Sequence, residues 1–223
     1  MTASKPEKVY KVLPEGRLIN GNLFGKDAYK DPETGKEGVP QYKAEIAFPK
    51  GGPIEEVIDW VAELVRAEYG DKVYMEHIED PERGLRAVET PFRDGDLIAE
   101  DRASRDKVGD AYKGMWVIRP NTIYNHEGQD GPGGIFVLDE DAETQLTPLD
   151  AGKVYNGCWI RAKVSSSAYK MNGKLGLKFY LVAAQKVKDD EKLTSPVDHR
   201  SDFAPAKGRT SGDGAQGRRS RKG

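Results

Sequence analysis

The sequence has one cysteine, three histidines and no long apolar run, and each shortage excludes a class of protein. The single cysteine, Cys158, excludes a disulfide framework and a thiolate zinc site. The histidines, at positions 77, 126 and 199, are far apart and show no metal-ligand spacing. No apolar stretch approaches the ~20 residues of a membrane span, and the N-terminus has no apolar segment typical of a secretory signal. We therefore expect a cytoplasmic protein without cofactor, metal or membrane.

Charged and turn-forming residues are abundant instead. Charged residues make up 32% and hydrophobic residues 37% of the 223 positions, which is within the range of globular proteins. The 25 glycines and 13 prolines favour short strands joined by turns. The length allows one large domain, which we place at residues 8–188, after a flexible N-terminus at 1–7.

The net charge of −2 conceals a basic tail. Residues 206–223 carry a net charge of +5, whereas residues 1–205 carry −7. Because the end of the chain is rich in Gly and Ser and poor in apolar residues, we expect disorder over 189–223. The tail is either a solubilising extension or an electrostatic arm for a polyanion, with contacts from Lys207, Arg209, Arg218, Arg219, Arg221 and Lys222.

Hydrophobic periodicity predicts one helix and several short strands. Apolar residues recur every three or four positions over 54–69, as in an amphipathic helix that begins after Pro53 and ends at Gly70. Trp60 flanks the apolar stripe and is expected to pack. Residues 71–85 are polar and are predicted to be mostly loop. Alternating or short apolar runs predict strands at 9–24, with a break at 14–16, and at 42–48, 88–92, 115–119 and 135–138.

Two long strands, 154–169 and 175–188, flank the turn sequence Asn172-Gly173. Asn-Gly is a strong hairpin signal, because a type I′ turn needs positive φ at both central residues. This turn predicts that Ala168 pairs with Leu177, Ser166 with Phe179, Val164 with Leu181 and Ala162 with Ala183. We expect these residues, with Ile160 and Cys158, to face the core.

The other face of this hairpin alternates aromatic rings with cations. Unpaired bases stack on aromatic rings, and Lys and Arg neutralise the phosphates between them. The rings predicted to stack are Tyr155, Trp159, Tyr169 and Tyr180, and the cations predicted to contact phosphates are Arg161, Lys163, Lys178 and Lys186. Two alternatives stay open: a second sheet layer packed on these rings, and a register shift of one residue, which would exchange the two faces.

Three stretches resemble the single-stranded DNA-binding proteins of tailed bacteriophages, a group that includes the T7-type helix-destabilising protein and a related phage family. They are Tyr42-Lys43-Ala44-Glu45-Ile46-Ala47-Phe48-Pro49-Lys50 followed by a helix; Pro91-Phe92-Arg93-Asp94-Gly95-Asp96 with 112–118; and the hairpin that begins at 154. The resemblance covers most of 8–188. The better-known members end in an acidic tail that recruits replication partners. Here the end is basic, and the acidic candidate is Asp189-Asp190-Glu191.

The resemblance implies a mostly-β protein: a five-stranded Greek-key barrel with an OB fold, one helix and long loops. It implies sequence-independent binding and protection of single-stranded DNA during phage replication, recombination and repair, without catalysis. It also implies phage or host replication and recombination proteins as partners, and it leaves the oligomeric state open. Two alternatives remain: a metal-dependent phage nuclease using Asp94, Asp96 and Glu100, and a phage structural β protein.

Overall fold

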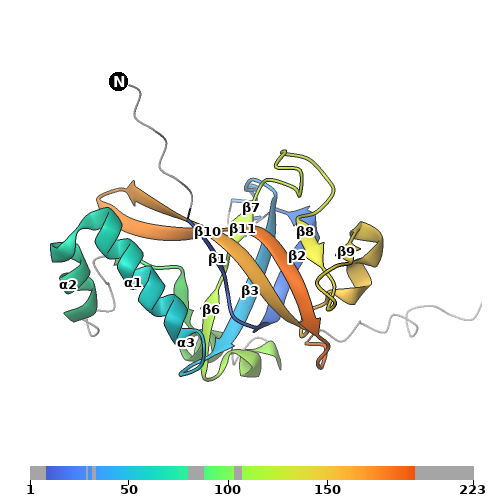
Figure 1. Cartoon of the computed structure of the whole chain (residues 1–223), viewed down its shortest axis with the longest axis horizontal. Helices are drawn as coiled ribbons and strands as arrows, with labels where there is room; N and C mark the ends of the chain where they lie inside the picture. The colour runs from blue at the N-terminus through green and yellow to red at the C-terminus, as the bar shows by residue number, and fades with distance from the viewer. Residues whose placement is uncertain (1–8, 29, 32–33, 80–87, 103–106, 194–223) are drawn as a thin grey trace, which may run out of the picture.

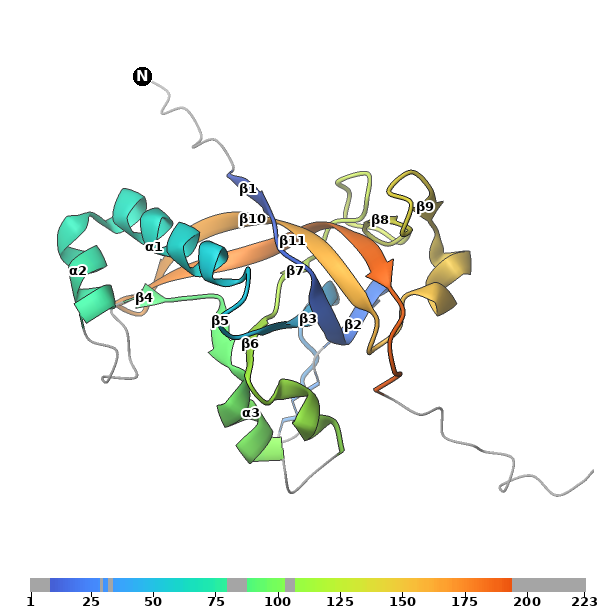
Figure 2. The ribbon, with the colours of Figure 1, turned by 60° about the horizontal axis from the view of Figure 1, so that its bottom comes forward.

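The computed structural model describes residues 9–28, 30–31, 34–79, 88–102 and 107–193. Its centre is a β-barrel, seen from two sides in Figures 1 and 2. Five strands pair in a closed ring: β2 (Gly16–Asp27), β3 (Gln41–Pro49), β7 (Asn121–Thr122), β11 (Lys174–Lys188), β10 (Trp159–Met171) and back to β2. The fourth and fifth strands of the ring exchange places relative to chain order, which agrees with the Greek-key barrel that the family resemblance implies.

Shorter strands extend this barrel. They are β1 (Tyr10–Val12), β4 (Val88–Glu89), β5 (Phe92–Asp94), β6 (Met115–Ile118), β8 (Phe136–Leu138) and β9 (Gln145–Leu146). The strands predicted at 115–119 and 135–138 are therefore confirmed, with shifted ends. The single strand predicted at 88–92 is instead two short strands, β4 paired with β11 and β5 paired with β6. Pro120 separates β6 from β7, because proline has no N–H to donate to a neighbouring strand.

The predicted amphipathic helix is confirmed as α1 (Glu55–Tyr69). Its apolar stripe, Val57, Val61 and Val65, is buried, and the Trp60 ring packs on Phe179 of β11 with the ring centroids 5.5 Å apart. Gly70 ends the helix with φ at 85°, a value that glycine adopts without a steric penalty. No helix among the described residues is long and apolar enough to cross a membrane.

Two further helices correct the expectation of a single one. The region predicted as mostly loop contains α2 (Asp71–Glu79), and the acidic run after Asp94 forms α3 (Gly95–Arg102). Both are short and polar, so neither has the long apolar stripe on which the prediction depended. Local polar contacts lie at their starts instead. Asp71 of α2 forms an ion pair with Arg66 of α1 at 2.6 Å, and the Asp94 carboxylate accepts the Asp96 N–H at 2.9 Å as a cap of α3.

The hairpin of β10 and β11 confirms the predicted turn and part of the predicted register. Asn172 and Gly173 have φ of 51° and 79°. Ala168–Leu177, Ser166–Phe179 and Val164–Leu181 pair as predicted, and Cys158 is buried. Beyond them the prediction is wrong: Ala162 pairs with Ala184 and not with Ala183, because the register shifts between Lys163 and Val164. Val182 is the extra residue of this β-bulge.

The bulge moves Lys186 to the core side of the hairpin. Lys186 pairs with Ile160 and is 6% exposed, so the prediction that it shares a face with Trp159 and Arg161 is wrong. Its ammonium lies 3.0 Å from Glu140 and 2.8 Å from Asp189. Burial alone would lower the pKa of Lys186, but the hydrogen bonds and charges of these two carboxylates outweigh it and raise the pKa above its ordinary value.

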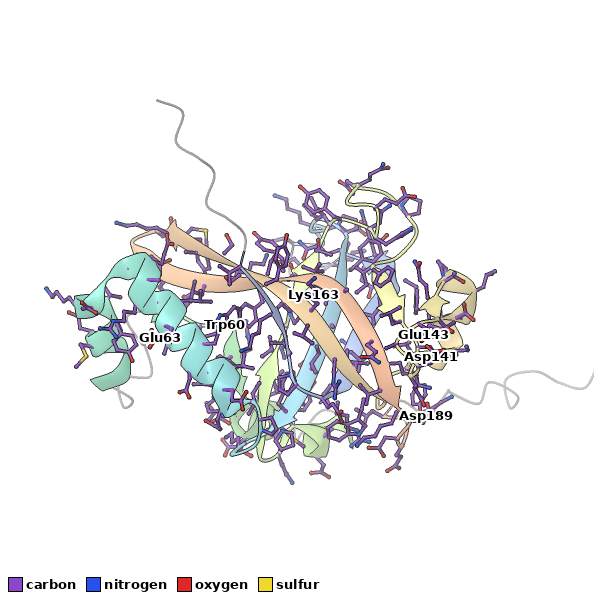
Figure 3. The ribbon with its side chains drawn as sticks, in the orientation of Figure 1. Trp60, Glu63, Asp141, Glu143, Lys163 and Asp189 are labelled. Atoms are coloured by element: carbon purple, nitrogen blue, oxygen red, sulfur yellow. The ribbon has the colours of Figure 1, made fainter. Side chains whose placement is uncertain are left out.

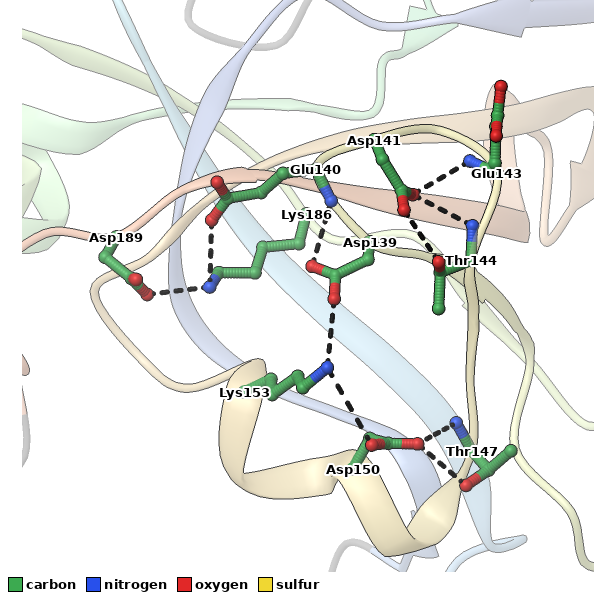
Figure 4. A network of polar contacts seen from close by, with 10 residues as sticks. All are labelled: Asp139, Glu140, Asp141, Glu143, Thr144, Thr147, Asp150, Lys153, Lys186 and Asp189. Atoms are coloured by element: carbon green, nitrogen blue, oxygen red, sulfur yellow. Dashed lines mark hydrogen bonds and ion pairs between the residues drawn. The ribbon is translucent and has the colours of Figure 1, made fainter.

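These ion pairs belong to a polar network that fixes the loops between β8 and β10 (Figure 4). Lys153 lies 3.0 Å from Asp139, and Thr147 with Asp150 forms a capping box at the turn of 3-10 helix over Pro148–Lys153. Asp141 accepts hydrogen bonds from the Thr144 hydroxyl at 2.6 Å, the Thr144 N–H at 2.8 Å and the Glu143 N–H at 2.9 Å. Because all three favour the charged carboxylate, they lower the pKa of Asp141 to about 2.

We expect this loop to open on acidification only when the pH approaches 2. The folded-state pKa of Asp141, about 2, is below the ordinary value of 3.8, so its stabilising effect is complete above pH about 4 and is lost as the pH falls towards 2. The measurement is an NMR titration of the Asp141 carboxyl carbon and the Thr144 amide. Asp141→Asn should remove the change in the Thr144 amide signal that occurs near pH 2 in the unmodified protein. A carboxyl that titrates near pH 4 would contradict the prediction.

Candidate nucleic-acid interface

One row of residues crosses five neighbouring strands, four from the closed ring and the edge strand β1. Backbone pairing joins Tyr10 to Ser165, Ser165 to Tyr180, Tyr180 to Asn121, and Asn121 to Lys43. Paired residues on adjacent strands project from the same face of a sheet. The five residues therefore form a continuous cross-strand row, from β1 through β10, β11 and β7 to β3.

A groove of about 1050 Å³ follows the first four members of this row. Its walls include Leu64 and Ala67 of α1 on one side and the segment after β7, with Tyr124 and His126, on another. Three rings of the groove are open to solvent, because Tyr10, Tyr180 and Tyr124 are 50%, 40% and 52% exposed. Exposed rings in a groove are available for stacking with flat ligand groups.

Cations lie on two of these rings. Lys163 Nζ is 5.2 Å from the centroid of the Tyr10 ring, and Lys178 Nζ is 5.0 Å from that of Tyr180. Figure 3 shows Lys163 on the hairpin, on a different element from Trp60 and Glu63 of α1. A ring beside an ammonium presents a stacking surface and a phosphate-binding charge within one residue pair.

The wall after β7 is held in one conformation by its own hydrogen bonds. The Asn125 side chain accepts the N–H groups of Glu127 and Gln129, both at 3.0 Å, and donates to the carbonyl of Pro132 at 2.9 Å. The Tyr42 hydroxyl donates to the Gly131 carbonyl at 2.7 Å. The loop is thus fastened to β3, and this wall of the groove does not have to order when a ligand binds.

The structure brings three of the eight predicted hairpin residues together. Lys163, Lys178 and Tyr180 lie at the groove or beside its Tyr10 ring. Arg161 projects from the same face of β10, but it forms an ion pair with Glu15 at 2.6 Å.

Tyr155 and Trp159 lie apart from the groove, under the segment that follows β11. The Trp159 indole N–H donates to Asp190 at 2.8 Å, and the Tyr155 hydroxyl donates to Asp189 at 2.9 Å. The Leu193 N–H donates to the Asn156 carbonyl at 2.9 Å. The segment 189–193 is therefore packed against the start of β10, and the acidic run is part of the folded region.

The remaining two predicted residues have other surroundings. Tyr169 lies at the hairpin end, where its ring fills the space beside Gly176 and its hydroxyl donates to Glu89 at 2.9 Å. Lys186 is on the core side, as described above. The tail residues Lys207, Arg209, Arg218, Arg219, Arg221 and Lys222 lie outside the described residues.

The sequence interpretation missed Tyr10, Lys43, Asn121 and Tyr124. An alternating pattern places Tyr10 and Lys43 on strands, but it gives no information on which strands become neighbours. Asn121 and Tyr124 follow Pro120 in a stretch with no periodicity. The row depends on pairings between distant segments, which no local pattern contains.

The rival nuclease site is not formed. Lys50 Nζ lies 2.7 Å from Asp94 and 2.7 Å from Asp96, so an ammonium occupies the position of the expected metal. Glu100 is exposed on α3. Within the ranges that the structure describes, no group of three or more His, Cys, Asp or Glu residues is arranged to hold a metal ion. Asp94 and Asp96 of the acidic run therefore form ion pairs with Lys50, and the run continues into the start of α3.

The chain resembles known proteins in both sequence and fold. A family model described as "Enterobacter phage Enc34, ssDNA-binding protein" matches residues 23–214. The solved structure of the single-stranded DNA-binding protein from bacteriophage Enc34 in complex with ssDNA has a TM-score of 0.55 and 19% identity, and covers 83% of this chain and 89% of that one. Its C-terminal truncation has a TM-score of 0.54 and 22% identity, over 82% and 87%.

The single-stranded DNA-binding protein gp2.5 encoded by bacteriophage T7 is similar at a TM-score of 0.50 and 14% identity, over 91% of this chain and 98% of that one. These likenesses show a shared fold. No curated protein matches the sequence. Because the family model covers most of the chain, including both strands of the central hairpin, the chain belongs to the family of the single-stranded DNA-binding protein of Enterobacter phage Enc34.

Proposed function

We propose that the protein binds single-stranded DNA independently of sequence and protects it during phage DNA replication, recombination and repair. The observation that carries the proposal is the groove along the cross-strand row, where exposed tyrosine rings lie beside lysine ammonium groups. The family membership supports the same function.

Binding has two parts in this site. Bases of the single strand stack on Tyr10, Tyr180 and Tyr124, while Lys163 and Lys178 neutralise phosphates between them. Every base has an aromatic face, so stacking of this kind accepts any sequence. Bases in a duplex are already stacked on each other and do not reach the rings, which gives the preference for single strands.

The proposal includes no catalysis. In this proposal Tyr10, Ser165, Tyr180 and Asn121, which line the groove, hold the DNA strand. Phage or host replication and recombination proteins are the proposed partners, and the host bacterial cytoplasm, where phage DNA is replicated, is the proposed location.

The test of the function is competition between single-stranded and duplex DNA. At moderate salt, binding of oligo-dT should exceed binding of its duplex by at least roughly tenfold, about 1.4 kcal/mol, the size of one stacked base. Fluorescence anisotropy with labelled oligonucleotides at two salt concentrations gives both affinities. Equal affinity for the two forms would overturn the proposal and indicate unspecific binding of polyanions.

Substitutions of two aromatic residues should separate binding from folding. Tyr180→Ala removes an exposed ring of the groove and should weaken oligo-dT binding by about 1–3 kcal/mol. Trp159→Ala removes a ring held by Asp190, outside the groove, and should lower the melting temperature with little change in affinity. Tyr180→Phe is the control, since it keeps the ring. Weaker binding by Trp159→Ala at unchanged stability would assign the stacking role to Trp159.

The basic tail is proposed to add electrostatic contacts outside the groove. Residues 206–223 hold six cations, and each phosphate neutralised on single strands changes the slope of log affinity against log salt by ~0.7. Deleting residues 206–223 should flatten the slope by about 1–3 units. The preference for single strands should survive, because this segment has no aromatic residue. An unchanged slope would show that the tail does not contact DNA.

A further inference from the structure

A second pocket opens beside the cross-strand row, at its Lys43 end. Its volume is about 320 Å³, at the lower end of the range for small-molecule sites and suited to one ring system. Gln41 and Asn121 line both this pocket and the larger groove, so the two are contiguous. A DNA strand that follows the groove therefore passes the mouth of the pocket. The exposed side chain of Val39 provides an apolar contact in its lining.

The polar lining contains a fixed carboxylate with one oxygen to spare. Glu45 is 8% exposed, and its Oε1 accepts hydrogen bonds from Tyr112 at 2.9 Å and from Arg119 at 2.6 Å. No described residue donates to its Oε2. Arg119 also has an unused group: its Nε is buried and has no hydrogen-bond partner in the described part of the chain. A spare acceptor and a spare donor thus lie within one ion pair.

The charges of the pocket cancel. Lys43 pairs with Asp27 at 3.1 Å, and Arg119 pairs with Glu45, so its two cations face two carboxylates. A site without net positive charge is unfavourable for a phosphate, which needs unpaired cations or N–H groups. A neutral ring with donors and acceptors on its edge fits such a lining, and in single-stranded DNA that group is a nucleobase.

We propose that this pocket takes one unstacked base of the bound strand and prefers guanine. Guanine presents two adjacent donors, N1–H and the exocyclic amine, which can share the spare Oε2 of Glu45, and it presents O6 and N7 as acceptors for Arg119 or the Asn20 and Asn121 amides. Adenine and cytosine have a ring nitrogen acceptor at the corresponding edge, which the carboxylate repels. Thymine offers a single donor between two carbonyl oxygens.

This inference rests on the proposed function and refines it. Stacking in the groove stays independent of sequence, while one position along the strand carries a base preference. Glu45 then serves as the hydrogen-bond acceptor of this position, while its charge is balanced by Arg119.

The test uses the full-length protein and oligo-dT in which one central thymine is replaced. The oligonucleotide with a single guanine should bind about fivefold tighter than those with adenine or cytosine at the same position. Replacement by 1-methylguanine, which lacks the N1–H donor, should abolish the gain. Free deoxyguanosine monophosphate should compete with the guanine oligonucleotide only at far higher concentration, because it lacks the groove contacts.

Glu45→Gln tests the residue itself. The amide keeps one oxygen for Tyr112 and Arg119 and replaces the spare acceptor with a donor, so the guanine preference should be lost while affinity for plain oligo-dT is retained or raised. Glu63→Gln is the matched control, since it removes one negative charge from the exposed side of α1 (Figure 3) and should leave the preference intact.

Two outcomes have different meanings. Equal binding of the guanine, adenine and cytosine oligonucleotides, with normal affinity for oligo-dT, would overturn the guanine pocket and leave the proposed function standing. Loss of oligo-dT binding altogether would refute the proposed function itself. If Glu45→Gln does not fold, the comparison of guanine with 1-methylguanine on the unmodified protein still decides the question.

Discussion

Pairing of β10 with β11 is the contact on which the rest of the structure depends. The Asn172-Gly173 turn fixes the register of the two strands, and β11 then pairs with β7, β8 and β4, while β10 pairs with β1 and β2. The barrel closes through these contacts. The extra residue Val182 reverses the alternation of β11 relative to β10. Lys178, before the bulge, is therefore on the outer face, whereas Lys186, after it, is on the core side.

The predictable parts of the fold are those set by neighbours in the chain. The helix over 54–69 follows from its own apolar stripe, and the register of Val164 with Leu181 follows from a turn a few residues away. The bulge is not predictable in the same way, because nothing in Val182-Ala183-Ala184 marks one residue as extra. The Lys186 prediction fails for this reason. The helix α2 has no apolar stripe that would distinguish it from a polar loop.

The combination of aromatic rings and cations in the candidate site could be predicted from the sequence, but only part of its residues could. Rings alternating with cations on the hairpin predicted a surface for single strands, and Lys163, Lys178 and Tyr180 lie at the groove or beside its Tyr10 ring. Trp159 and Tyr155 bond instead with a segment that follows β11, since Asp189 and Asp190 supply acceptors for their polar atoms. Figure 3 labels Asp141, Glu143 and Asp189 at the end of the molecule towards which β11 runs, and the carboxylates of this end pair with Lys153, Lys186 and Arg17.

The cross-strand row would also couple binding of the proposed DNA ligand to local unfolding of the barrel. Its members come from the β10–β11 hairpin and from β1, β7 and β3, which are distant from the hairpin in the chain, and β1 is a three-residue strand at the edge of the sheet. Short edge strands detach more readily than central ones, and amide hydrogens exchange through such openings. Under the proposed function, a DNA strand along the row would contact all five elements at once, so detachment of any one of them would also break contacts with the DNA. Bound DNA would then slow amide hydrogen exchange across the sheet by mass action and would add to the cooperativity of the barrel.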